Sequence, residues 1–183
     1  MKKFIARTFL LSIPLILFGI AVVFYNIYQD PYGVIRGDMA TQVLEPNQHY
    51  LKMKHCIEYP KKYNAFLFGS SRVGKINVET IPDTNNWYNM SYSMATPYET
   101  LKDLEILLKN KIEIKQILIG LDNITYQEFP ELHLSNYMKK PYRNKFNPYW
   151  EYFFITPSCD YNSARNEMEN SKFYTKGAYE IFY

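Results

Sequence analysis

The first apolar block of the chain is long and unbroken, unlike the short blocks that follow it. Residues Thr8 to Gln29 form 22 consecutive uncharged positions. A helix rises about 1.5 Å per residue, so a block of this length crosses a hydrocarbon core of about 30 Å. Tyr25 and Tyr28 lie where interfacial aromatic residues are common. Three basic residues precede the block: Lys2, Lys3 and Arg7.

This block predicts a membrane anchor that stays on the protein. No cleavage site of small residues follows at the right distance, which favours an uncleaved signal anchor over a removed signal peptide. The positive-inside rule then places the N-terminus in the cytoplasm and residues 30–183 in one extracytoplasmic domain. We therefore expect a single-pass cell-membrane protein, with residues 1–29 as cytoplasmic end and anchor. A helix buried in a globule is the alternative.

After the turn Asp30–Gly33, short blocks alternate between helical and strand patterns. The predicted elements are a helix near Gln48–Tyr59, strands at Ala65–Phe68 and Trp87–Met90, a helix from Pro97 to about Asn110, and a strand at Gln116–Leu121. The last strand is continuously apolar, as expected of a strand covered on both faces. This order predicts an α/β sandwich around a parallel sheet.

The pattern weakens beyond Phe129. The aromatic run Tyr149–Ile155 is compatible with a helix that packs on the body or one that lies on a membrane. No fourth strand is evident, so the sheet looks unfinished where the sequence stops at Tyr183.

Composition narrows the function classes. The net charge of +3 comes entirely from the basic residues before the anchor, so the remainder is neutral and nucleic acid is not an expected partner. The 18 tyrosines fit a carbohydrate-facing surface or a plain composition bias.

Cys56 and Cys159 either form a disulfide or remain two thiols. His49, His55 and His133 share no metal-ligand spacing, so neither a metal nor another cofactor is expected.

The strongest chemical signal follows the first strand of the ectodomain, where the chain reads Gly69-Ser70-Ser71-Arg72. A strand that ends in a turn of small residues fixes and exposes a hydroxyl, which is how α/β folds present a nucleophile. A serine that only caps the following turn is the simpler alternative. A second alternative is a phosphate-binding loop, since Gly74-Lys75-Ile76 completes a pattern one residue short of the P-loop.

These residues resemble the SGNH/GDSL-type hydrolases. The resemblance is to their membrane-anchored branch linked to acylation of cell-surface polymers, which includes alginate O-acetylation proteins and the D-alanyl-lipoteichoic-acid transfer protein. An N-terminal anchor, D-P-Y-G, F-G-S-S-R, N-M-S and L-D-N occur here in the matching order, over roughly residues 30–130. The resemblance implies a three-layer α/β sandwich and an extracytoplasmic bacterial enzyme.

The resemblance also implies roles for individual residues. Ser71 matches the nucleophile, and its backbone N–H would help to hold the oxyanion. Met94 stands in the second block, where the family supplies a glycine N–H to the same hole. Asn123 would donate its side chain, although Asp122 and Asn123 are swapped relative to the family's G-x-N-D. Arg72 would orient an acidic group of the substrate or pair with a core carboxylate.

The family's catalytic base is a histidine in a D-x-x-H motif, and this sequence contains no such motif. A serine without a base is a poor nucleophile at neutral pH. The chain is therefore expected to be part of a longer enzyme or a domain that has lost catalysis. The resemblance predicts an acyl-ester hydrolase or O-acyltransferase that acts on a cell-surface polysaccharide. The alternative is an anchored module that binds a glycan or a partner acyltransferase.

Overall fold

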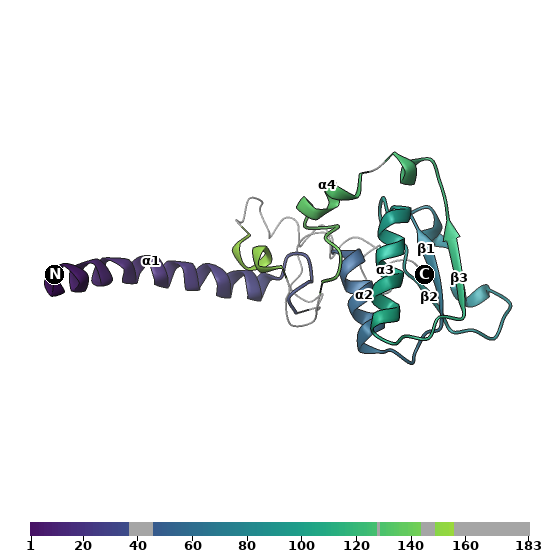
Figure 1. The fold of residues 1–183 in the computed structure, drawn as a ribbon, viewed down its shortest axis with the longest axis horizontal. Coiled ribbons are helices and arrows are strands. Elements are labelled where there is room, and N and C mark those ends of the chain that lie inside the picture. Colours follow the sequence, from purple (N-terminus) through teal and green to yellow (C-terminus); the bar gives the residue numbers. More distant parts are fainter. Residues whose placement is uncertain (37–45, 128, 144–148, 156–183) are drawn as a thin grey trace, which may run out of the picture.

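A computed structural model describes residues 1–36, 46–127, 129–143 and 149–155. The apolar block forms helix α1 (Lys2–Gln29), which projects as a rod from the rest of the molecule (Figure 1). Within it, Arg7–Gln29 is long and apolar enough to cross a membrane. The most apolar stretch is not buried inside the molecule, so the alternative of a core helix is wrong.

The elements predicted after residue 30 are confirmed to within one residue at each end. They are α2 (Gln48–Glu58), β1 (Ala65–Gly69), β2 (Trp87–Asn89), α3 (Pro97–Lys109) and β3 (Gln116–Gly120). The chain then forms the short helix α4 (Pro130–Ser135) and the 3-10 turn η5 (Trp150–Phe154). Helix α3 begins sharply because Thr96 and Glu99 form a capping box and Pro97 occupies the first turn.

The three strands form a parallel sheet in the order β2-β1-β3. Helices α2 and α3 lie on one face of this sheet (Figure 1). Because side chains alternate along a strand, Phe66 and Phe68 of β1 join the core with both helices, while Ala65 and Leu67 point to the other face. That second face is packed by residues of the β1–β2 connection, including Val78. The fold is therefore mixed α/β with a small parallel sheet.

Strand β3 contradicts the expectation that it is covered on both faces. Its three central residues, Ile117, Leu118 and Ile119, are between 41 and 45% exposed. In the part of the chain that the structure describes, β1 is the only strand paired with β3, which makes β3 an edge strand. Leu101 and Leu108 of the neighbouring helix α3 are exposed as well.

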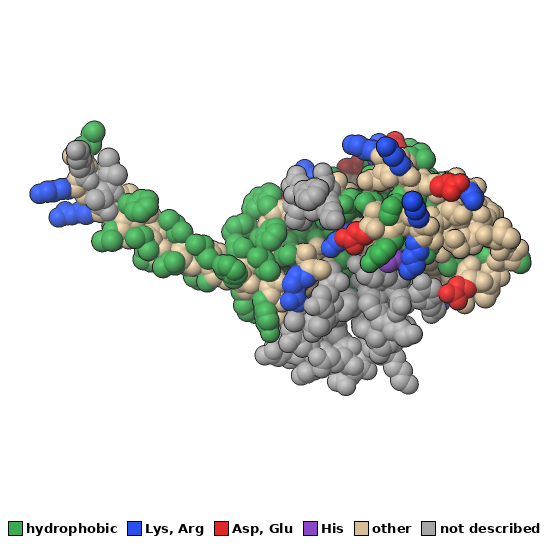
Figure 2. Space-filling view, turned by 90° about the horizontal axis from the view of Figure 1, so that it is seen from below, with side chains coloured by type: hydrophobic (Ala, Val, Ile, Leu, Met, Phe, Trp, Pro, Cys, Tyr) green, Lys and Arg blue, Asp and Glu red, His purple; other side chains and the backbone are tan. Residues whose placement is uncertain are grey.

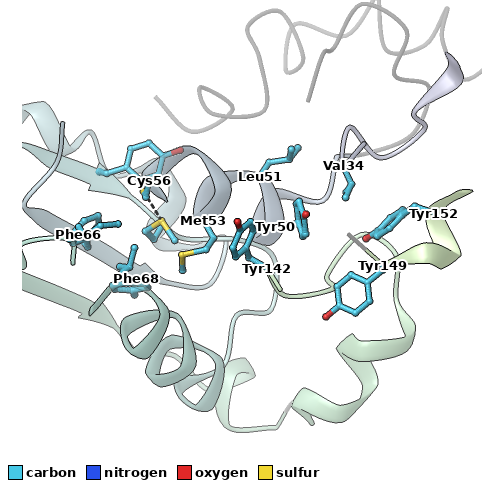
Figure 3. Close-up of a cluster of buried hydrophobic side chains, with 14 of the residues drawn as sticks. Val34, Tyr50, Leu51, Met53, Cys56, Phe66, Phe68, Tyr142, Tyr149 and Tyr152 are labelled. Carbon is cyan, nitrogen blue, oxygen red and sulfur yellow. Dashed lines mark hydrogen bonds between the residues drawn. The ribbon is translucent and has the colours of Figure 1, made fainter. Parts of the chain in front are cut away.

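The main core runs from the sheet through α2 to η5 and is rich in tyrosine (Figure 3). Its buried tyrosines are Tyr50, Tyr88, Tyr142, Tyr149 and Tyr152. The core therefore takes up several of the tyrosines that a carbohydrate-facing surface would otherwise explain. Cys56 is a buried free thiol whose Sγ lies 3.7 Å from Met90 Sδ, whereas Cys159 lies outside the described residues.

Candidate functional site

The polar residues singled out in the sequence follow the carboxyl ends of the strands. Parallel strands bring their carboxyl ends to one edge of a sheet, where α/β proteins commonly bind ligands. Ser70 and Ser71 follow the central strand β1, while Asp122 follows β3. The register pairs Gly69 with Gly120, so the turns after β1 and β3 begin side by side. The small depression between them and the start of α3 is lined in part by Thr96 and Thr125.

Gly69 is required where β1 turns into this edge. Its φ of +144° is rarely adopted by residues with a side chain. A Cβ atom there would lie 2.6 Å from Val73 Cγ2 and 2.7 Å from the carbonyl oxygen of Gly120. The glycine therefore lets the turn and β3 approach each other closely.

The two serines of the turn have different environments. Ser70 is buried, and its hydroxyl donates a hydrogen bond to the Asp122 carboxylate. The other oxygen of that carboxylate accepts from the backbone N–H of Thr125 at 3.1 Å. Ser71 is exposed, and no described residue forms a hydrogen bond with its hydroxyl. Asp122 thus ties the end of β1 to the end of β3 and leaves Ser71 facing solvent.

The end of β2 braces the same turn from the other side. The amide nitrogen of Asn89 donates to the carbonyl oxygen of Gly74 at 3.1 Å, and its oxygen accepts from the Ser91 hydroxyl at 2.6 Å. Asn89 is 7% exposed, so these bonds are shielded from water. Asn89 and Asp122 could not be recognised as positioning residues from the sequence, because their partners Gly74 and Ser70 lie in the turn after β1.

Met94 has the backbone conformation expected of a glycine. Its φ is +62°, in the left-handed region that residues with a Cβ atom avoid. This is the position that the resemblance matches to a glycine of the oxyanion hole. Its Sδ accepts a hydrogen bond from Lys139 Nζ at 2.7 Å.

Arg72 and Asn123 are both exposed. Arg72 forms no ion pair with a carboxylate of the described residues. Its backbone N–H donates to the Ser70 hydroxyl at 3.3 Å. The side chain of Asn123 likewise forms no hydrogen bond within the described part. The structure thus brings Ser71, Arg72 and Asn123 to one edge of the sheet, each on the solvent side.

The P-loop alternative is wrong. A P-loop leads into a long helix whose N-terminus binds phosphate. Here the loop leads into a 3-10 turn of three residues, Val73–Lys75, followed by Ile76 in an extended conformation.

All three histidines of the sequence are engaged inside the body. His133 of α4 is 2% exposed, and its Nδ1 lies 2.7 Å from Glu99 Oε1. Burial opposes ionisation of Glu99, but the hydrogen bond with His133 and the nearby imidazoles outweigh burial and hold its pKa below the usual value. His55 is half-buried, and burial together with Lys62 lowers its pKa to about 4.

His49 forms a second buried pair, with Asp103. Its Nε2 lies 2.9 Å from both carboxylate oxygens, and its Nδ1 lies 3.2 Å from the carbonyl oxygen of Lys139. Two acceptors require two donors, which only the protonated imidazole provides. Although burial opposes the charge, Asp103 raises the pKa of His49, and burial raises the pKa of Asp103. The pair therefore holds a proton tightly and joins α2 to α3.

His49 and His133 are both buried, so neither is accessible as a base at the edge of the sheet where Ser71 lies. In the described ranges, no group of three His, Cys, Asp or Glu residues could hold a metal ion. No model of a protein family matches the chain, and no curated protein and no solved structure matches it either.

Proposed function

We propose that the protein is a membrane-anchored, SGNH-like serine acyl-ester hydrolase or O-acyltransferase, with α1 as the anchor and Ser71 as the nucleophile. One observation carries this proposal: of the two adjacent serines after the central strand, Ser70 is bound to Asp122, while the hydroxyl of Ser71 faces solvent. The left-handed backbone of Met94, at the position matched to a glycine, supports an oxyanion hole made with the N–H of Ser71 and the side chain of Asn123. The matching substrate class is a cell-surface polysaccharide on the extracytoplasmic side.

The base must come from outside the three histidines of this sequence. His49 and His133 are buried with carboxylate partners, and the pKa of His55 is too low for a base at neutral pH. We therefore propose that a base from another polypeptide or from further sequence completes the site. The engagement of these histidines favours one alternative, an anchored module that binds glycan or a partner acyltransferase without reacting.

The two functions are separated by labelling the full chain in lipid nanodiscs with a fluorophosphonate. The enzyme proposal expects Ser71-dependent labelling that Ser71→Ala abolishes. Free imidazole should increase the labelling rate, because it supplies the missing base. Ser135→Ala is the matched control, since Ser135 is exposed on α4 and distant in sequence. Absence of labelling with and without imidazole, together with retention on immobilised polysaccharide, would favour the binding module.

A further inference from the structure

The turn η5 has one face in the body and one face outside it. In a 3-10 helix, residues three apart lie on the same side. Tyr149, Tyr152 and Ile155 follow this spacing and are buried, at 9, 1 and 8% exposure. Trp150 and Phe154 point the other way and are 65 and 52% exposed, with ring centroids 5.9 Å apart. A pair of large aromatic side chains is thus turned outward beside α1.

A polar residue of the membrane-crossing helix holds this turn in place. Asn26 of α1 is fully buried, and its amide nitrogen donates to the carbonyl oxygens of Phe153 at 2.9 Å and Ile155 at 3.0 Å. Carbonyl groups without partners are costly in a hydrocarbon environment, where water cannot replace the lost bond. Asn26 supplies partners for the carbonyl groups where η5 ends, as a segment placed at membrane depth requires.

An apolar groove continues from this contact along α1. Phe154 forms one wall of the groove, and residues of the helix form the rest: Ile16, Gly19, Ile20, Val23 and Phe24. Gly19 has no heavy atom within 4 Å of the place where a Cβ would lie, so the groove is open there. These helix residues precede Gln29 by several positions, which at about 1.5 Å per residue places them well inside a bilayer. Figure 2 shows the hydrophobic surface continuing from α1 onto the adjoining end of the body.

We propose that η5 inserts into the bilayer leaflet on the ectodomain side. Trp150 and Phe154 contact lipid, and the groove beside Phe154 holds acyl chains. The proposal rests on the anchoring of α1 proposed above but not on the chemistry of Ser71. The charge distribution supports lipid as the occupant, because the one acidic residue of η5, Glu151, turns toward Lys140 of the body at 3.6 Å. Aromatic residues at a membrane surface favour the same region of the bilayer.

A second helix is a less suitable occupant. Close helix packing in membranes commonly uses small residues four positions apart. The positions four before and four after Gly19 are Leu15 and Val23. The groove therefore lacks the stripe of small residues that a second copy of α1 would pack against.

The two tryptophans of the sequence make the proposal testable in the full chain. Trp87 is 9% exposed in β2, and its Nε1 donates to Asp83 at 3.0 Å. In nanodiscs that contain phosphatidylcholine brominated along its acyl chains, we expect Trp150 to be quenched and Trp87 to be spared. Trp150→Phe should therefore abolish the quenching, whereas Trp87→Phe should keep it. Trp150→Phe replaces an exposed side chain and should therefore preserve the fold.

A second tryptophan at position 154 tests whether the loss of quenching in Trp150→Phe only reflects a local change at that site. In the Trp150→Phe background, Phe154→Trp should restore quenching, most strongly with bromine near the middle of the acyl chain. The matched control is Tyr126→Trp in the same background, because Tyr126 is about as exposed as Trp150 but lies after β3. This control should remain unquenched.

Quenching of Trp150 no greater than that of Trp87, in protein incorporated into nanodiscs, would overturn the proposal. Dimers that form in nanodiscs and shield Phe154→Trp from bromine would overturn it too, in favour of a second copy. Failure of the chain to enter nanodiscs would overturn both the anchor and this inference. Loss of fluorophosphonate labelling with intact quenching would overturn only the enzyme.

Discussion

Leu67 and Leu118 occupy neighbouring places in the sheet and have opposite environments. They are register partners in β1 and β3, yet Leu67 is 0% exposed and Leu118 is 45% exposed. Strand β1 has a strand on each side and a packed layer on each face. Strand β3 has one paired edge within the described residues. The difference teaches that a continuously apolar sequence shows only that a strand could be buried. Whether the strand is buried depends on which neighbouring strands and helices cover it.

The largest expected effect comes from truncating these two leucines in parallel. Leu67→Ala should lower the free energy of unfolding by about 2–5 kcal/mol, because it empties a fully buried site. Leu118→Ala should lower it by less than about 1 kcal/mol, because the side chain is already half in solvent. Urea unfolding of the detergent-solubilised full chain measures both. Equal losses would mean that β3 is covered in solution.

The helix-covered face of the sheet should also show a pH dependence that the open edge lacks. Lys52 of α2 is buried, and its Nζ donates to the carbonyl oxygen of Ser91 at 2.5 Å. Burial lowers the pKa of Lys52 from 10.5 to about 7. Between these values the unfolded chain binds more protons than the folded one, so stability rises with pH by up to about 1.4 kcal/mol per pH unit.

Lys52→Met should remove this slope between pH 7 and pH 9.5 and raise stability most at the lower pH. The measurement is urea unfolding at several pH values. Lys102→Met is the matched control, because Lys102 is exposed on α3 and should leave the slope in place. An unchanged slope in Lys52→Met would refute the assignment to this lysine.

A smaller effect is expected at Met94, in the loop between β2 and α3. Met94→Gly relieves the left-handed backbone and should raise the free energy of unfolding by up to about 1 kcal/mol. Met94→Ala keeps the Cβ while it removes the contact with Lys139, so the difference between the two variants isolates the backbone term. Thermal unfolding by circular dichroism compares them. If Met94→Gly were less stable than Met94→Ala, the left-handed backbone at this position would not be strained.

The smallest effect on stability is expected from a charge on the open strand. Leu118→Lys should change the free energy of unfolding by less than about 0.5 kcal/mol, since the side chain is half-exposed. It should nevertheless reduce self-association, because lysine on an edge strand opposes pairing with another chain. Light scattering at rising protein concentration measures this. Tyr126→Lys adds the same charge outside the sheet and should leave association unchanged.

The helices and strands could be predicted from local sequence signals. Which of their faces are buried in the fold could not. The spacing of leucines after Pro97 predicted α3, and the apolar run at Ala65 predicted β1. The exposure of β3 was missed because it depends on which strands pair, which no local pattern encodes.

The candidate site divides in the same way. The turn of small residues after β1 marked Ser71, because that signal is local. The bond from Ser70 to Asp122 depends on cross-strand register, and the carboxylate partners of His49 and His133 come from α3. None of these contacts follows from sequence spacing. The left-handed backbone of Met94 does not follow from its residue type, since methionine gives no hint of a positive φ, although the resemblance matches this position to a glycine.

The hydrogen bonds of Asn26 also fix how the body is held at the end of α1. They join positions 127 and 129 residues apart, and Asp30 nearby accepts hydrogen bonds from the backbone N–H groups of Ile35 and Arg36. The body is thus mounted directly on its stalk, with the sheet at the end away from α1 (Figure 1). A body held in this way keeps one orientation relative to α1, whereas a domain on a flexible linker samples many orientations. Under the anchoring and the nucleophile proposed above, the position of Ser71 above the membrane would be fixed, and a substrate would have to extend to that height to reach it.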